Sequence, residues 1–185
     1  DSIISPTVGN RQNVRVYMTL SIILLQLMKG MGVTAEIFFL TLLFSLPLGL
    51  LVAFGRMSKN GIIRMISKIY ISVLRGTPLM LQLIVVYFAP FYVFHLKVGN
   101  YRFPAIIIAF ALNYAAYFAE IYRAGIESMP VGQYEAARVL GYSRLQTFVR
   151  IILPQVIKRI LPPVTNETIT LVKDTSLAFV LAQAE

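Results

Sequence analysis

The sequence contains no cysteine and a single histidine, His95, among its 185 residues. Disulfides and thiol chemistry are therefore excluded, and His95 has no acidic, Cys or His cluster beside it that would form a metal site or a nucleophile–base pair. No G-x-x-x-x-G-K-[S/T] loop is present, so we expect nothing in this chain to hold the phosphates of ATP. Residues 1–13 are polar and lack the apolar stretch of a secretory signal peptide. These absences predict a chain that is not itself an enzyme.

Apolar residues, by contrast, are abundant. They make up 57% of the chain, and the mean hydropathy is +0.73, far above the values of soluble domains. We expect an all-α integral membrane protein, one domain over residues 1–185 with about four to five spanning helices of ~20 residues each. The net charge of +9 lies at the ends of apolar segments, which favours positive-inside topology over nucleic-acid binding.

Four spans are predicted, at about residues 33–54, 79–94, 103–122 and, more polar than the others, 156–172. Residues 14–28 precede a break at Lys29-Gly30-Met31-Gly32, and we interpret them as an interfacial helix, with an extension of the first span as the alternative. Between residues 54 and 79 we expect a loop that carries Arg56, Lys59, Arg64 and Lys68. Basic residues are densest after the first and third spans, so these loops should be cytoplasmic and the N-terminus outside, although Arg11 and Arg15 argue weakly otherwise.

A short basic amphipathic unit separates the third and fourth spans. Pro130 suits the first position of a helix, and Gly141 suits its end, since glycine adopts the left-handed conformation without a Cβ penalty. Ser143 and Gln146 form the pattern of a capping box for a second helix. That helix should have three apolar residues on one face: Leu145, Phe148 and Ile152. The pattern predicts a helix–glycine–helix elbow with three basic residues, Arg138, Arg144 and Arg150.

The elbow sequence Glu135-Ala136-Ala137-Arg138, followed by Gly141 and later by Ile152-Leu153-Pro154, resembles the cytoplasmic coupling loop of ATP-binding-cassette importer permeases. Other segments resemble the polar amino-acid uptake family of these permeases, the histidine/arginine/glutamine type. They are Arg75-Gly76-Thr77-Pro78-Leu79 with Gln82, Ala119-Glu120-Ile121-Tyr122-Arg123 with Gly125, and Lys173-Asp174-Thr175-Ser176-Leu177. The resemblance extends from about Thr34 to the end. The family normally continues into a final membrane helix, which would begin near Glu185.

This resemblance implies a type I importer permease fold and a pore-forming subunit of an ATP-driven importer for polar, preferably basic, amino acids. The family's partners would be an ATP-binding subunit that binds ATP and Mg²⁺, a second permease copy or sister permease, an extracytoplasmic solute-binding protein and membrane lipid. The location would be the bacterial inner membrane. Residues 126–153 would be the coupling loop, in which Glu135, Ala136, Ala137, Arg138 and Gly141 contact the ATP-binding subunit. An ordinary interfacial helix is the alternative interpretation of the elbow.

Candidate substrate contacts are the polar groups at membrane depth, where ionisable residues are costly. Glu167 and its neighbour Asn166 follow Pro162-Pro163, which we expect to break the helix and free backbone carbonyls. By the resemblance, Glu167 is the first candidate for recognition of a cationic substrate; alternatively, hydroxyls or Lys173 satisfy it. Asp174 is a second candidate, or forms a charge pair with Lys173. Three further residues either line the pore or join helices: Asn113, Gln82 and Tyr117.

Two other expectations follow from the same segments. Glu120 and Arg123 lie three residues apart and should form an ion pair near the cytoplasmic end of their helix. An ion-coupled secondary transporter would also place a carboxylate in a broken helix, and it is the alternative function, but such transporters carry internal repeats and none is visible.

Overall fold

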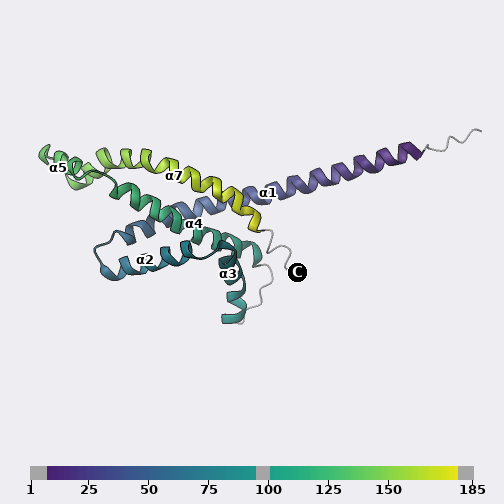
Figure 1. The fold of residues 1–185 in the computed structure, drawn as a ribbon, viewed down its shortest axis with the longest axis horizontal. Coiled ribbons are helices and arrows are strands. Elements are labelled where there is room, and N and C mark those ends of the chain that lie inside the picture. Colours follow the sequence, from purple (N-terminus) through teal and green to yellow (C-terminus); the bar gives the residue numbers. More distant parts are fainter. Residues whose placement is uncertain (1–7, 95–100, 179–185) are drawn as a thin grey trace, which may run out of the picture. The chain divides into compact units, whose positions relative to one another are not determined.

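The computed structural model describes residues 8–94 and 101–178, and within these ranges all of its regular secondary structure is helical (Figure 1). The predicted all-α class is confirmed. His95 lies outside the described residues. By its internal contacts the chain divides into two compact units, residues 1–36 and residues 37–185. The elements in chain order are α1 (Val8–Arg56), α2 (Gly61–Gly76), α3 (Leu79–Phe94), α4 (Arg102–Glu127), α5 (Val131–Val139), α6 (Arg144–Gln146), the π-helical η1 (Thr147–Ile152), α7 (Leu153–Asp174) and the 3₁₀-helical η2 (Thr175–Leu177).

Helix α1 is continuous from Val8 to Arg56, so the predicted break at Lys29-Gly30-Met31-Gly32 is wrong. Each glycine weakens a helix by about 1 kcal/mol but keeps its N–H and C=O, so the helical hydrogen bonds persist. The surrounding leucine and methionine residues favour the helix. Leu20–Arg56 is long and apolar enough to cross a membrane, which agrees with the alternative of an extended first span.

Small residues allow α1 and α4 to approach closely. In α1, Thr41, Ser45, Gly49 and Ala53 follow one another at four-residue spacing, and all four are buried. A Cβ added at Gly49 would lie 2.9 Å from the Cβ of Phe118 and 3.1 Å from the carbonyl oxygen of Ala115. Small residues at this spacing are typical of helix contacts in membranes.

Helix α4 is the central element of the second unit and confirms the predicted third span. It buries the large side chains of Phe110, Tyr114 and Phe118, whose rings stack or tilt against one another at 6.3 Å. Helices α2, α3 and α7 all pack against it. Its 26 residues are sufficient to cross a membrane.

Helix α2 replaces the loop that the sequence predicted after the first span. Asn60 caps it, because its side-chain oxygen accepts a hydrogen bond of 3.0 Å from the N–H of Ile62. Arg64, Lys68 and Arg75 lie on one side of the helix, and most of the remaining residues are apolar. Tyr70 donates a 2.6 Å hydrogen bond to the carbonyl of Leu112, which ties α2 to α4. The predicted loop is wrong because the basic residues were interpreted as loop residues, whereas their spacing is that of one face of an amphipathic helix.

A bend of 111° at Thr77-Pro78 joins α2 to α3. Helix α3 has 16 residues, fewer than the ~20 of a straight span, so the predicted span at 79–94 is a helix but not a full crossing by itself. The described residues include two helices that are long and apolar enough to span, and the bent α2–α3 pair would make a third.

Helix α7 covers the predicted fourth span and runs without interruption through Pro162 and Pro163. The expected local break is therefore wrong. Each proline still lacks an N–H, so the carbonyls one turn earlier, on Lys158 and Arg159, have no backbone donor from these positions. Its many polar residues keep α7 out of the set of spans defined by length and hydropathy.

Candidate functional site

The elbow has the conformation that the sequence predicts. Helix α5 ends at Val139, and Gly141 follows with φ of +78° in the left-handed region. The capping box is complete: the N–H of Gln146 donates to the Ser143 hydroxyl at 3.3 Å, and the N–H of Ser143 donates to the Gln146 side chain at 2.9 Å. Pro130 occupies the N-cap, one position before the predicted first residue. Local sequence signals therefore fix the elbow.

The second helix of the elbow departs from a regular α-helix at η1, a π-helical segment. Ile152 is fully buried and Phe148 packs beside it, whereas Leu145 is 72% exposed. The predicted common face of these three residues is wrong at Leu145. An i→i+5 turn contains one more residue than an α turn, so the spacing used for the prediction does not apply across η1.

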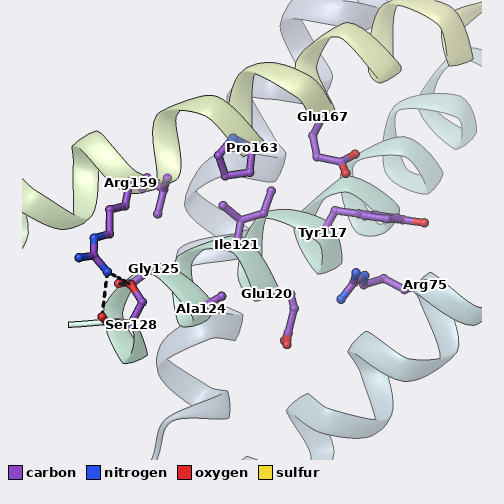
Figure 2. Close-up of a pocket in the computed structure, with 11 residues that line it drawn as sticks. Arg75, Tyr117, Glu120, Ile121, Ala124, Gly125, Ser128, Arg159, Pro163 and Glu167 are labelled. Atoms are coloured by element: carbon purple, nitrogen blue, oxygen red, sulfur yellow. Dashed lines mark hydrogen bonds between the residues drawn. The ribbon is translucent and has the colours of Figure 1, made fainter. Parts of the chain in front are cut away.

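The elbow is firmly attached to α4 and α7. Gln133 of α5 and Gln155 of α7 exchange two side-chain hydrogen bonds, of 2.8 and 2.6 Å. Arg159 of α7 donates to the carbonyl and hydroxyl oxygens of Ser128, at the end of α4, at 2.9 and 3.1 Å (Figure 2). A small apolar core, the elbow cluster, lies between the elements and consists of the buried residues Met129, Ile152 and Val156.

The outer surface of the elbow mixes charged and apolar side chains. Glu135, Ala136 and Arg138 are exposed, whereas Ala137 is buried against the rest of the unit. Val139 and Leu140 are 87% and 73% exposed. A short helix with an exposed apolar end and flanking charges is suited to a groove on a partner protein.

Two cavities lie between α4, α7 and the α2–α3 bend. The elbow-side cavity has a volume of about 500 Å³ and extends from Ser128 and Arg159 to Glu167 (Figure 2). The bend-side cavity has a volume of about 360 Å³ and extends from Thr77 and Pro78 to Asp174. Tyr117 and Glu167 line both cavities and mark their junction.

Glu167 projects from α7 toward this junction (Figure 2). Within the described residues its carboxylate has no hydrogen bond and no ion pair, so neither a hydroxyl nor Lys173 satisfies it there. The nearby threonines instead bond to their own helix: Thr165 to Leu161 and Thr168 to Val164. Arg75 and Asp174 are close enough to act on Glu167 electrostatically. An acceptor without a partner that faces a cavity is available to a ligand.

Asp174 is held by Tyr114, whose hydroxyl donates a 2.7 Å hydrogen bond to it across 60 residues of sequence. Tyr114 is 1% exposed and Asp174 is half-buried, so this bond joins α4 to the end of α7 at the edge of the core. The described part of the chain contains no ion pair between Asp174 and Lys173. Asp174 lines the bend-side cavity, whereas Asn166 is exposed and lines neither cavity.

Gln82 and Asn113 form the joint that holds the α2–α3 bend. The Gln82 amide donates to the carbonyls of Leu74 and Thr77 at 2.8 and 3.0 Å. The Asn113 amide donates to Leu74 at 3.1 Å and to Gln82 at 2.9 Å. These bonds favour the helix-joining role for both residues. Asn113 also lines the bend-side cavity, whereas Gln82 lines neither.

Arg75 and Tyr117 contact each other beside the junction of the two cavities. The Arg75 guanidinium carbon lies 5.1 Å from the centre of the Tyr117 ring, a cation–π contact (Figure 2). Arg75 appeared in the sequence only within the Arg-Gly-Thr-Pro segment, and neither Arg75 nor Tyr114 was among the predicted site residues. Further along α4, Arg123 pairs with Glu120 and also with Glu127, which confirms the predicted i,i+3 ion pair.

Comparison with known proteins identifies the family. A family model described as the inner membrane component of binding-protein-dependent transport systems matches residues 45–184, a range that includes the elbow and both cavities. The chain belongs to this family. No group of three or more His, Cys, Asp or Glu residues that could hold a metal ion occurs within the described part of this permease chain.

Individual relatives of the permease chain are amino-acid permeases. It is 40% identical over 156 residues to the L-cystine transport system permease protein TcyB of Bacillus subtilis, a match covering 84% of this chain and 65% of TcyB. It is 36% identical over 162 residues to the putative glutamine transport system permease protein GlnP of Rickettsia prowazekii, covering 88% and 73%. A crystal structure of an amino acid ABC transporter with histidines matches at a TM-score of 0.74 and 35% identity, covering 87% of this chain and 77% of the other. These matches confirm the predicted family and fold.

Proposed function

We propose that the permease chain is the pore-forming subunit of an ATP-driven importer of polar amino acids, with a preference for cationic ones. The observation that carries this proposal is the charge of the bend-side cavity. Glu167 and Asp174 line it, and none of its lining residues within the described ranges is basic. Because a buried or half-buried carboxylate binds a cation more strongly than a neutral group, an ammonium or guanidinium group is the complementary ligand.

The relatives support amino acids in general as the substrates. TcyB is named for cystine and GlnP for glutamine, so the named amino acids differ in size and in polar groups within this set of relatives. We assign selection among amino acids within the pore to the residues that face the cavities. The ion-coupled secondary transporter, which was the alternative, receives no support from the family or the relatives.

Energy would come from a partner ATP-binding subunit, which would hold ATP and Mg²⁺. The exposed residues of α5 support this arrangement: Glu135, Ala136 and Arg138 are accessible to a partner, while Ala137 and the elbow cluster anchor the helix beneath. Residues 126–153 would thus act as the coupling loop of a single permease domain. An extracytoplasmic binding protein would deliver the substrate, and a second permease copy or sister permease would complete the pore.

The proposed location is the bacterial inner membrane, with the N-terminus outside and the elbow in the cytoplasm. Single cysteines can test this orientation, because the chain has none of its own. Asn60→Cys and Ser143→Cys should be protected from a membrane-impermeant thiol reagent in intact cells, whereas Gly99→Cys should react. The cysteine-free chain is the matched control. Labelling of Ser143→Cys from outside would refute the orientation and the cytoplasmic elbow.

The substrate proposal is tested on the complete transporter, purified with its ATP-binding subunit and reconstituted in lipid nanodiscs. Binding of labelled lysine, arginine, histidine and glutamine is measured side by side. We expect lysine and arginine to bind more tightly than glutamine. Tighter binding of glutamine would refute the cationic preference, and absence of binding by all four would refute the amino-acid site itself.

A further inference from the structure

The two cavities differ in charge although they meet at the same pair of residues. Among the described residues that line the bend-side cavity, the charged ones are two carboxylates, Glu167 and Asp174. The elbow-side cavity contains two arginines, Arg75 and Arg159, with Glu120 and Glu167. A cation that enters the bend-side cavity is attracted by these carboxylates, whereas one that moves on toward the elbow also meets positive charge.

Arg75 differs in its bonding from other charged residues that line the elbow-side cavity. Arg159 donates to Ser128, and Glu120 is paired with Arg123. Within the described residues Arg75 has neither a hydrogen bond nor an ion pair, and its contact is the ring of Tyr117 at 5.1 Å. Its charge nevertheless acts on both Glu120 and Glu167. The guanidinium is therefore a cation held beside the junction and free to change its partner.

Tyr117 determines where that cation is held. In the view of Figure 2 the Tyr117 ring lies between the Glu167 carboxylate and the Arg75 guanidinium. The ring attracts the guanidinium through its face, and no ion pair between Arg75 and Glu167 forms within the described residues. Glu167 is thereby left open toward the cavities.

We infer that Arg75 is a specificity-determining residue whose positive charge competes with a cationic substrate for Glu167, and that Tyr117 limits this competition by holding the guanidinium on its ring. This inference rests on the proposed function and adds a resident competitor to the substrate site. The positive charge of Arg75 beside the junction repels a cation bound at Glu167 and offers the carboxylate an alternative partner. Arg75 thus weakens the binding of cationic substrates and speeds their departure, and it has little effect on neutral ones.

The test compares the complete transporter with two variants, Arg75→Gln and Arg75→Lys, in lipid nanodiscs and in proteoliposomes. Dissociation constants of lysine and glutamine and their maximal uptake rates are measured. We expect Arg75→Gln to bind lysine roughly three- to tenfold more tightly and to transport it more slowly, with glutamine binding changed less than about twofold. Arg75→Lys should restore both values for lysine. Arg64→Gln removes an arginine from the same helix that lines neither cavity, so it should leave every value unchanged.

Tyr117→Leu supplies a prediction of the opposite sign, which serves also if Arg75→Gln fails to assemble. Without the ring, Arg75 pairs with Glu167, so lysine should bind less tightly while glutamine changes little. Lysine affinity that is unchanged or lower in Arg75→Gln, or an equal gain for glutamine, would overturn the inference and leave the proposed function standing. A native transporter that binds neither amino acid would refute the proposed function, and the inference with it.

Discussion

The two ends of α7 are held in different ways. At its beginning, Gln155 and Arg159 bond to neighbouring elements, and the elbow cluster packs around Ile152 and Val156. Toward its end, the described hydrogen bond to another element is that of Asp174 with Tyr114, while the threonines bond back to their own helix. The first end is hydrogen-bonded to its neighbours, as an element that transmits motion from the elbow would be. The second leaves its carboxylates and carbonyls beside cavities, as a ligand site requires.

Removal of the charge at the open end should give the largest effect. Glu167→Gln keeps the length of the side chain and one acceptor. Hydrogen bonds to charged groups contribute about 1.5–3 kcal/mol, so uptake of lysine should fall by roughly ten- to a hundredfold and uptake of glutamine should fall less. Uptake by the reconstituted transporter is measured with saturating binding protein. Asn166→Ala changes the preceding residue, which lines neither cavity, and is the control. Equal losses for both substrates would show that Glu167 supports the helix and does not distinguish cationic from neutral substrates.

A change at the elbow should affect all substrates alike. Gly141 has φ of +78°, and no atom lies within 4 Å of the position that a Cβ would take, so Gly141→Val acts through the backbone and not through a clash. A β-branched residue in this region costs about 1–2 kcal/mol, so uptake should fall roughly five- to thirtyfold. Gly132→Val places the same side chain in open space on α5, where no positive φ is required, and should cost much less. Normal uptake by Gly141→Val would show that the bend is not needed for transport.

The Gln133–Gln155 pair allows a milder test of the hydrogen-bonded end of α7. Either single change to leucine leaves the other amide without its partner, which at this part-buried site costs about 1 to 1.4 kcal/mol. Substrate-stimulated ATPase activity of the complex should therefore fall by roughly five- to tenfold in each single variant. The double variant should recover part of the loss, because no unpaired amide remains. Additive losses would contradict a direct bond between the two side chains.

Hydroxyl removal at the open end should give the smallest effect. Thr170 lines the bend-side cavity, whereas Thr165 lines neither cavity, and both donate to a carbonyl one turn earlier. Thr170→Val should weaken lysine binding by about two- to threefold, the size of a weak hydrogen bond. Thr165→Val should leave it unchanged. A larger effect at Thr165 would place the substrate outside the bend-side cavity.

Elements determined by neighbouring residues were the ones that could be predicted from the sequence. Gly141 and the Ser143–Gln146 box act within four residues, so the bend and the helix ends beside it were predicted almost to the residue. Helix α4 was predicted because its apolar run is long. Helix α2 was missed because Arg64 and Lys68 look like a loop until the capping by Asn60 is known.

Site residues depended on contacts that the sequence does not show. Glu167 could be selected because a carboxylate in an apolar segment stands out. Arg75 and Tyr114 could not, since their partners Tyr117 and Asp174 belong to other helices. The proline pair at 162–163 led to a wrong prediction of a helix break. Proline usually interrupts a helix, but α7 continues through both positions.

The π-helical segment η1 sets the rotational phase of everything that follows it in α7. One extra residue in a turn corresponds to about 100° of rotation about the helix axis, given 3.6 residues per α-helical turn. Deleting one residue between Thr147 and Ile152 would convert η1 to an α-helix and leave Glu167 pointing in its present direction. The same deletion between Leu153 and Pro162 would turn Glu167 by that angle away from both cavities. The π-helical segment thus accommodates one extra residue between the elbow and Glu167 without turning Glu167 away from the cavities.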